Sequence, residues 1–184
     1  MTYLFQYLAP LPTGSWAPHM KLGVFTKHFE RGSFEEVLDA VKASGFAAVQ
    51  LNLESVVGEA APDALSGATC DRIREGLRLR GIELAALSGT FFNIIHRDTA
   101  ERARGLHRLR VLASSCERMG APRITFATGT RDRNNMWADH PLNDTPEAWA
   151  DMLACMTPCV QIATEFKVPL CFEPEVSNGT RLLR

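Results

Sequence analysis

The clearest candidate for chemistry in this sequence is a carboxylate that directly follows a short apolar run. Val168–Phe172 is the apolar run, and Glu173 follows it. A short apolar run after a helical segment is typical of a buried parallel strand, and α/β folds place their functional groups at the carboxyl ends of such strands. A carboxylate there can exchange a proton or bind a metal ion. The alternative is an ordinary solvated carboxylate at a strand end.

Polar and aromatic residues also follow the other apolar runs. Glu54 follows the run 46–53, and His96 follows the run 82–87. The run 124–127 is followed by three further candidates, which are Arg131, Trp137 and His140. The histidines could instead be ordinary loop residues, Arg131 could pair locally with Asp132, and Trp137 could pack under its loop. Candidate functional residues thus follow nearly every predicted strand, which is the arrangement expected at the rim of a barrel.

One unit, a short apolar strand followed by an amphipathic helix, repeats from Met20 onward, which predicts a parallel sheet. The predicted strands are 20–25, 46–53, 82–87, 124–127 and 168–172. The predicted helices begin after the capping residues Ser33, Asp98 and Thr145, with one more around Ile73 and Leu77. Gly45, Gly81 and Gly120 end the first three helices.

The last predicted helix carries two expectations about its side chains. Pro158 lies inside it and should kink or interrupt it. Its inner face is expected to hold Trp149, Met152, Leu153, Met156 and Val160.

A doubly wound sheet and a (β/α)₈ barrel both fit such units. We predict the TIM-barrel type, because no glycine-rich phosphate-binding motif follows the first strand and candidates follow nearly every strand. A complete barrel takes about 250 residues. The expected organisation is therefore an irregular N-terminal extension over 1–19 and a partial barrel over 20–184, truncated after the fifth strand.

Composition narrows the partners and the compartment. Twenty basic and 21 acidic residues give a net charge of -1, which points away from nucleic acid and anionic membranes and toward small molecules. The five cysteines are odd in number and scattered, which indicates free thiols in a reducing compartment, and we expect a cytoplasmic protein. No apolar run approaches the roughly 18 residues of a membrane span.

Several segments resemble sugar phosphate isomerase/epimerase proteins of the xylose isomerase-like TIM-barrel superfamily. The similar segments are Leu22–Lys27 for the first strand, Ser88–Phe91 with Asn93 and His96 for the third loop, Thr128–Asp132 with Asn135–Trp137 and His140–Pro141 for the fourth loop, and Leu170–Glu175 for the fifth strand. The resemblance covers residues 20 to about 178.

The resemblance implies metal-assisted proton transfer next to a carbonyl of a sugar or sugar phosphate. Such proteins hold one divalent ion, Mn²⁺, Mg²⁺, Co²⁺ or Zn²⁺, through ligands at the ends of the fifth to eighth strands. Only Glu173 matches a ligand position of these proteins, and the resemblance implies that it acts as metal ligand and catalytic base. Metal binding by this chain is therefore expected to be weak or absent. The expected substrate-binding residues are Glu54, His96, Arg131, Trp137 and His140.

Three alternatives remain open. An inosose dehydratase-like lyase would use the same metal chemistry with a different leaving group. An apurinic endonuclease-like hydrolase would need more strand-end histidines and a basic surface. The third alternative is a truncated, non-catalytic product that is stabilised by self-association through the open edges of the first and fifth strands.

Overall fold

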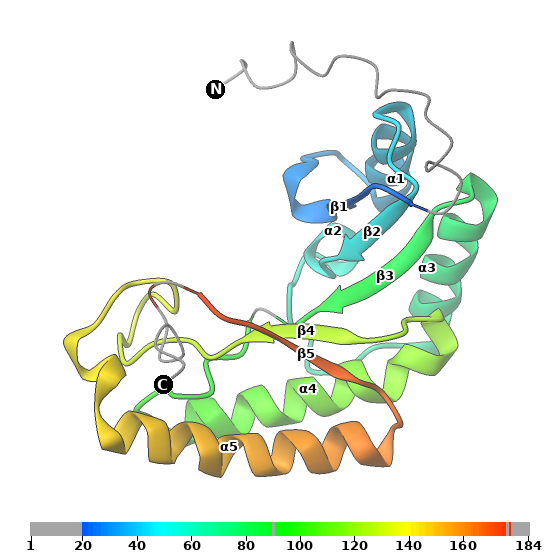
Figure 1. The fold of residues 1–184 in the computed structure, drawn as a ribbon. Helices are drawn as coiled ribbons and strands as arrows, with labels where there is room; N and C mark the ends of the chain where they lie inside the picture. Colours follow the sequence, from blue (N-terminus) through cyan, green and yellow to red (C-terminus); the bar gives the residue numbers. More distant parts are fainter. Residues whose placement is uncertain (1–19, 90, 176, 178–184) are drawn as a thin grey trace.

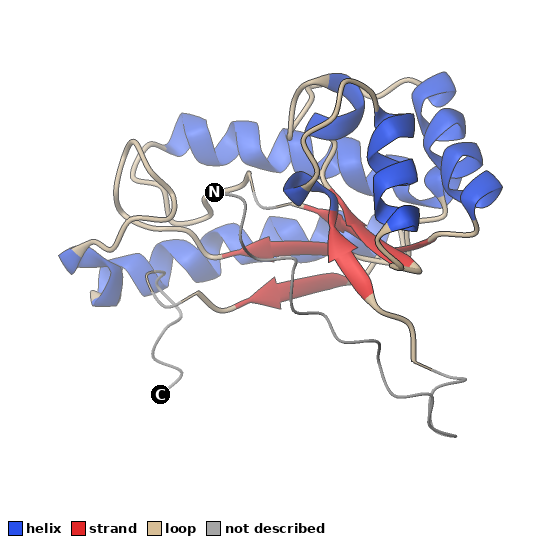
Figure 2. Cartoon of the chain, turned by 90° about the horizontal axis from the view of Figure 1, so that it is seen from above, coloured by secondary structure: helices blue, strands red, loops and turns tan. Residues whose placement is uncertain are grey.

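A sheet of five parallel strands organises the molecule, and the helices lie on one face of it (Figure 1; Figure 2). The computed structural model describes residues 20–89, 91–175 and 177; the extension expected over 1–19 lies outside the described residues. The strands are β1 (Gly23–Phe25), β2 (Ala48–Leu51), β3 (Glu83–Ser88), β4 (Ile124–Ala127) and β5 (Leu170–Glu173). Their order in the sheet is their order in the chain.

Helices connect the strands. The α-helices are α1 (Phe34–Ala43), α2 (Glu54–Val57), α3 (Gly67–Arg80), α4 (Thr99–Met119) and α5 (Pro146–Glu165). Two 3₁₀ helices also occur, η2 (Thr26–His28) and η3 (Pro141–Asp144). Sequential order and one helical layer distinguish this arrangement from a doubly wound sheet, whose strand order reverses and whose two faces are both covered. The predicted TIM-barrel type is confirmed.

The capping residues expected from the sequence begin their helices. The Ser33, Asp98 and Thr145 side chains accept hydrogen bonds from the first backbone N–H groups of α1, α4 and α5. Gly81 and Gly120, with φ of 63° and 77°, end α3 and α4 in the left-handed conformation. Local sequence signals therefore fix these boundaries.

The core lies between the helices and the sheet face that they cover. Its fully buried large side chains include Phe34, Leu38, Leu51, Ile73, Leu87, Leu109, Leu112 and Phe126. A polar contact crosses the sheet elsewhere: Gln50 Nε2 of β2 donates to Thr125 Oγ1 of β4 at 2.8 Å, past the intervening strand β3. In the interior of a barrel, side chains from alternate strands pack in one layer, as Gln50 and Thr125 do here.

The expectations about the last helix were wrong in part. α5 runs through Pro158 without the predicted interruption. Met152 is buried and Met156 partly buried, as expected. Trp149, Leu153 and Val160 are exposed, at 47%, 51% and 54% of their surface, because α5 turns Met152, Cys155 and Cys159 toward the sheet. None of the helices among the described residues is long and apolar enough to cross a membrane.

Candidate functional site

A pocket of about 400 Å³ opens at the carboxyl ends of the strands, between residues of β1, β2, β5 and the loop after β4. We call it the Glu173 pocket. Its lining residues are Phe25, Lys27, His28, Gln50, Trp137, Glu173 and Glu175. It brings together two of the residues predicted from the sequence, Glu173 and Trp137.

Glu173 is the last residue of β5, so sheet hydrogen bonding fixes its backbone. It pairs in register with Ala127, the last residue of β4, and its side chain is half-buried. Glu175 follows two residues later, beyond the end of the strand, and lines the same pocket. The more rigid of the two carboxylates is therefore Glu173.

Lys27 brings a positive charge to the pocket from η2, directly after β1. Its Nζ lies 5.1 Å from the centre of the Phe25 ring and 6.0 Å from the centre of the Trp137 ring. Both distances are within the range of cation–π attraction, which holds the ammonium against the aromatic wall while leaving its donors available. The pocket thus combines carboxylates, an ammonium and an aromatic surface.

Hydrogen bonds within the loop after β4 position Trp137. Asp132 Oδ1 accepts from the backbone N–H groups of Asn134 and Asn135, both at 2.8 Å, and Asn135 Oδ1 accepts from the backbone N–H of Trp137 at 3.0 Å. The two bonds to Asp132 lower the pKa of its carboxyl, since they stabilise the charged form. Trp137 itself is 42% exposed, so its ring is available to a ligand.

Glu54 lines a neighbouring pocket of about 400 Å³, which is distinct from the Glu173 pocket. Glu54 begins α2 and is exposed. Its backbone N–H donates to Asn52 Oδ1 at 2.9 Å, and its backbone oxygen accepts from the N–H of Gly58 at 3.0 Å. Lys27 lines both pockets. The predicted residues Glu54 and Glu173 therefore line two different pockets that share Lys27.

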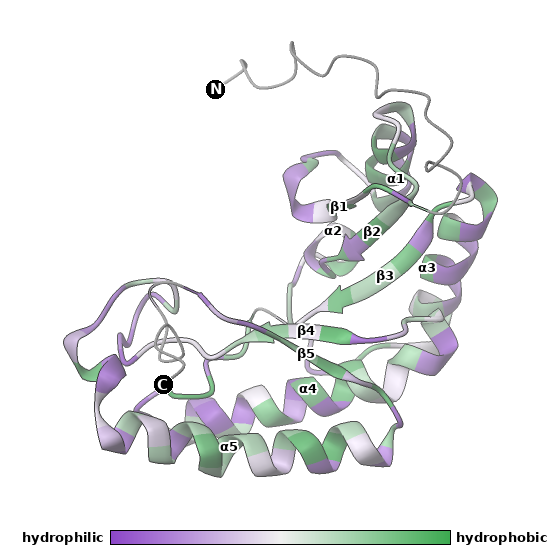
Figure 3. Ribbon diagram, viewed as in Figure 1, coloured by the Kyte–Doolittle hydropathy of each residue, from purple (hydrophilic) through white to green (hydrophobic). Residues whose placement is uncertain are grey.

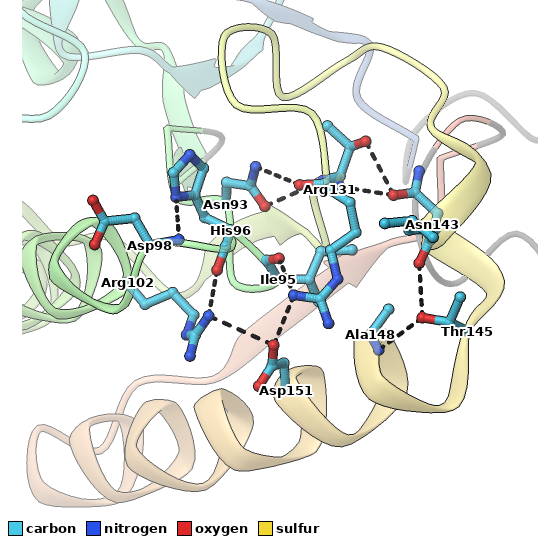
Figure 4. Close-up of polar contacts among 12 residues, drawn as sticks. Asn93, Ile95, His96, Asp98, Arg102, Arg131, Asn143, Thr145, Ala148 and Asp151 are labelled. Atoms are coloured by element: carbon cyan, nitrogen blue, oxygen red, sulfur yellow. Dashed lines mark hydrogen bonds and ion pairs between the residues drawn. The ribbon is translucent and has the colours of Figure 1, made fainter.

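Arg131 is buried, with 6% of its surface exposed, and its contacts lie within the protein (Figure 4). Its Nη1 donates to the backbone oxygen of Ile95 at 3.1 Å and to Asp151 Oδ2 at 2.7 Å. Its backbone N–H donates to Asn143 Oδ1 at 2.7 Å. These contacts join the loop after β3, the loop after β4 and the start of α5, and Arg131 does not line the Glu173 pocket.

The two predicted histidines also interact with the backbone of their loops. His96 Nδ1 accepts from the backbone N–H of Asp98 at 3.1 Å, immediately before α4. His140 Nδ1 accepts from the backbone N–H of Leu142 at 3.2 Å and caps η3. Neither lines the Glu173 pocket, and His96 contributes to a smaller pocket beside α4.

The candidates from the sequence did not include four polar residues of this pocket, Lys27, His28, Gln50 and Glu175. Lys27 stands directly after a predicted strand, the same signal that identified Glu173, so it could have been found. Gln50 lies inside β2 and is held by Thr125. Its contribution depends on the curvature of the sheet, which no local pattern in the sequence reports.

The residues described by the structure contain no group of three or more His, Cys, Asp or Glu side chains that could hold a metal ion. Glu173 and Glu175 supply two carboxylates from one strand end. This donor set is too small for the divalent ions that the resemblance implies, which take more ligands.

A parallel sheet in chain order, with a polar interior layer and a pocket at the carboxyl ends of its strands, defines a TIM-barrel-type protein. Residues 38–183 match the model of the xylose isomerase-like TIM barrel family. The chain belongs to this family. Among curated proteins there is no match.

Solved structures share the fold at low sequence identity. The 3-keto-D-glucoside 4-epimerase YcjR of E. coli is 15% identical with a TM-score of 0.64, over 84% of this chain and 56% of that one. The D-psicose 3-epimerase of Clostridium cellulolyticum H10, solved with D-tagatose, is 15% identical with a TM-score of 0.62, over 83% and 52%. The IolI protein with a bound zinc atom is 17% identical with a TM-score of 0.61, over 84% and 51%. The chain thus spans about half the length of these proteins.

Proposed function

We propose that this chain is a sugar or sugar-phosphate isomerase/epimerase-like protein whose binding site is the Glu173 pocket. The observation that carries the proposal is the meeting of Glu173 with Lys27 and Trp137 in one pocket at the carboxyl ends of the strands. Two of the similar structures are sugar epimerases by name, which supports the same class of substrate.

The residues of the pocket suit proton transfer next to a carbonyl. The Glu173 carboxylate is the base, which removes a proton from the carbon beside the carbonyl of a bound ketose. The Lys27 ammonium stabilises the negative charge that then develops on the carbonyl oxygen. The exposed face of Trp137 packs against the C–H groups of the sugar, as aromatic side chains do in ligand pockets.

A divalent metal would polarise the same carbonyl, but the described residues do not form a cage for one. No step of the proposed reaction therefore passes through a metal. We expect this chain to bind sugar and to epimerise it slowly or not at all, because inversion needs a proton donor on the opposite face of the carbon and no carboxylate from another described strand lines the Glu173 pocket.

The cysteines support a reducing compartment for this protein, and we propose the cytoplasm. Cys70, Cys116, Cys155 and Cys159 are buried free thiols, and Cys171 is a half-buried one. Burial raises the pKa of Cys116 to about 12, which keeps that thiol protonated and unreactive.

The test has a binding arm and a chemistry arm. Saturation-transfer NMR against ketoses and ketose phosphates should detect binding that Trp137→Ala weakens at least several-fold. Trp149→Ala is the matched control, because Trp149 is equally exposed but lies on α5 outside the pocket. Loss of binding in both variants, or in neither, would contradict the assignment of the pocket.

The chemistry arm follows deuterium from solvent into carbons next to the ketose carbonyl. Any exchange that this chain catalyses should be lost in Glu173→Gln and kept in Glu175→Gln. Equal loss in the two variants would exclude Glu173 as the specific base. Cleavage of abasic DNA without any sugar exchange would favour the endonuclease-like alternative.

A further inference from the structure

The connection between β4 and α5 carries Trp137 to the Glu173 pocket, yet little of it is apolar. It spans residues 128–145 and includes the short helix η3. Figure 3 shows mostly hydrophilic or neutral colour along it. Because a long segment of this composition gains little from burying apolar side chains, it needs specific hydrogen bonds to adopt one conformation. The side chains that supply those bonds therefore determine where Trp137 lies.

Asn143, in η3, closes the base of this loop. Its Oδ1 accepts from the backbone N–H of Arg131 at 2.7 Å and from Thr130 Oγ1 at 3.1 Å. Trp137 lies six residues after Arg131 and six before Asn143, in the middle of the segment that these bonds close. Asn143 is 2% exposed, so water has little access to replace its bonds.

The amide nitrogen of Asn143 binds the segment that carries the carboxylates of the pocket. Its Nδ2 donates to the backbone oxygen of Ser177 at 2.8 Å. Ser177 follows Glu173 by four residues and Glu175 by two, and both carboxylates line the pocket. One buried side chain thus joins the loop that bears the aromatic wall to the segment that follows β5.

Thr130, one of the partners of Asn143, is itself held by the preceding loop. Asn93, between β3 and α4, donates from Nδ2 to the backbone oxygen of Thr130 at 2.8 Å and accepts at Oδ1 from its N–H at 3.2 Å. Figure 4 shows Asn93 and Asn143 on opposite sides of the Arg131 backbone. Gly129 permits this approach, because a Cβ there would overlap the Asn93 side chain. Thr130 is therefore a fixed point from which Asn143 holds the rest of the loop.

We propose that Asn143 is a positioning residue of the Glu173 pocket, which holds Trp137 and the segment after β5 in one arrangement. Its effect on ligand binding rests on the proposed function, whereas its effect on Trp137 exists without a ligand. Preorganisation of this kind lowers the conformational entropy that is lost when a ligand binds. Without the Asn143 amide, Trp137 should sample several positions, and a sugar should bind more weakly although every residue that lines the pocket is still present.

Fluorescence of Trp137 in the ligand-free protein is the first test. Trp16→Phe and Trp149→Phe leave Trp137 as the single tryptophan of the chain. In that background Asn143→Ala should lower the steady-state anisotropy of Trp137, because the loop is no longer closed at its base. Ser115→Ala is the matched control, since it removes a buried hydrogen bond within α4, outside the pocket, and should leave the anisotropy unchanged. An unchanged anisotropy in Asn143→Ala, or an equal fall in the control, would overturn the proposal.

Thr130→Val keeps this test decisive if far-UV circular dichroism shows that Asn143→Ala does not fold. Valine has nearly the shape of threonine but lacks the hydroxyl that donates to Asn143 Oδ1 and accepts from the backbone N–H of Asp132. The variant keeps the bond from the Arg131 backbone to Asn143, so the anisotropy should fall in the same direction by a smaller amount. No change in folded Thr130→Val protein would also contradict the proposal.

A double-mutant cycle for sugar binding distinguishes positioning from a purely structural role. In saturation-transfer NMR against the panel of ketoses and ketose phosphates, Asn143→Ala should weaken binding several-fold in the wild-type background. In the Trp137→Ala background it should weaken binding by a smaller factor, because the side chain that it positions is absent. Equal factors in the two backgrounds would show that Asn143 does not act through Trp137. Absence of sugar binding by the wild-type chain would contradict the proposed function alone, and the anisotropy would then decide the role of Asn143.

Discussion

The Nη1 atom of Arg131 lies 2.7 Å from Asp151 Oδ2, and this ion pair joins the loop after β4 to the first half of α5. The Arg131 side chain is 7% exposed and that of Asp151 is 37% exposed. The same loop carries Trp137 to the Glu173 pocket. An arginine expected from the sequence to bind substrate is thus placed to stabilise the loop that carries Trp137 to the Glu173 pocket.

Replacing Arg131 should therefore lower stability. Arg131→Met leaves the Ile95 carbonyl without this donor and leaves Asp151 paired with Arg102 alone, at 3.7 Å. We expect the free energy of unfolding to fall by about 2 to 3 kcal/mol, somewhat less than for a fully buried pair because Asp151 is partly hydrated. Urea denaturation measures the change. The exposed Arg133 is the control, and Arg133→Met should change stability by less than about 0.5 kcal/mol. Equal stability of both variants would contradict the proposed role.

Gly105→Ala should destabilise the protein even though alanine favours helices. Gly105 lies inside α4, where alanine is normally better than glycine by about 1 kcal/mol. A Cβ at this position would overlap the ring of Phe92, which is 2% exposed and cannot move into solvent. We expect a loss of about 1 to 3 kcal/mol from overpacking. A melting temperature above that of the wild type would show that the ring moves aside.

The ion pair between α1 and α3 should make stability depend on acid. Hydrogen bonding from Arg72 lowers the pKa of Glu35 from 4.5 to about 2. The contribution of Glu35 is thus complete above about pH 5 and disappears as the pH falls toward 2. Glu35→Gln should cost about 0.5 to 1 kcal/mol at pH 7, since both side chains are more than two-fifths exposed, and nothing near pH 2. Chemical denaturation at several pH values measures this, and a cost that persists at pH 2 would exclude the ion pair as its source.

Divalent metal should bind this chain weakly. The described residues offer Glu173 and Glu175 at one strand end and no group of three donors, and affinity depends on ligand number and geometry. Calorimetric titration with Mn²⁺ should show no binding tighter than the micromolar range. Sub-micromolar binding that Glu173→Gln abolishes would mean that further ligands complete the site.

The fold could be predicted from the sequence because its signals are local. Ser33, Asp98 and Thr145 begin helices, and Gly81 and Gly120 end them, through contacts within a few residues. The side chains of α5 could not be placed in the same way. A helix at the edge of the described sheet has apolar residues on two sides, and periodicity alone does not show which side faces the strands.

The candidate site could be predicted only in part, for a related reason. Position after a strand identified Glu173 and Trp137, and the structure brings them together. The same rule applied equally to Arg131, whose environment is decided by Asp151 in the following helix. Long-range contacts thus distinguish a residue that lines the pocket from one that holds a loop, and both occupy the same kind of position in the sequence.

The strand order of the sheet also has a consequence for how the chain folds. Each strand lies beside its immediate predecessor, so every new pairing joins neighbouring units of the chain. Such local pairing keeps the entropic cost of loop closure small at each step. A growing polypeptide can therefore add β2 to β1, and then each later unit, as it leaves the ribosome. β5 is the last of these strands to be synthesised, and the Glu173 pocket is completed only when it docks.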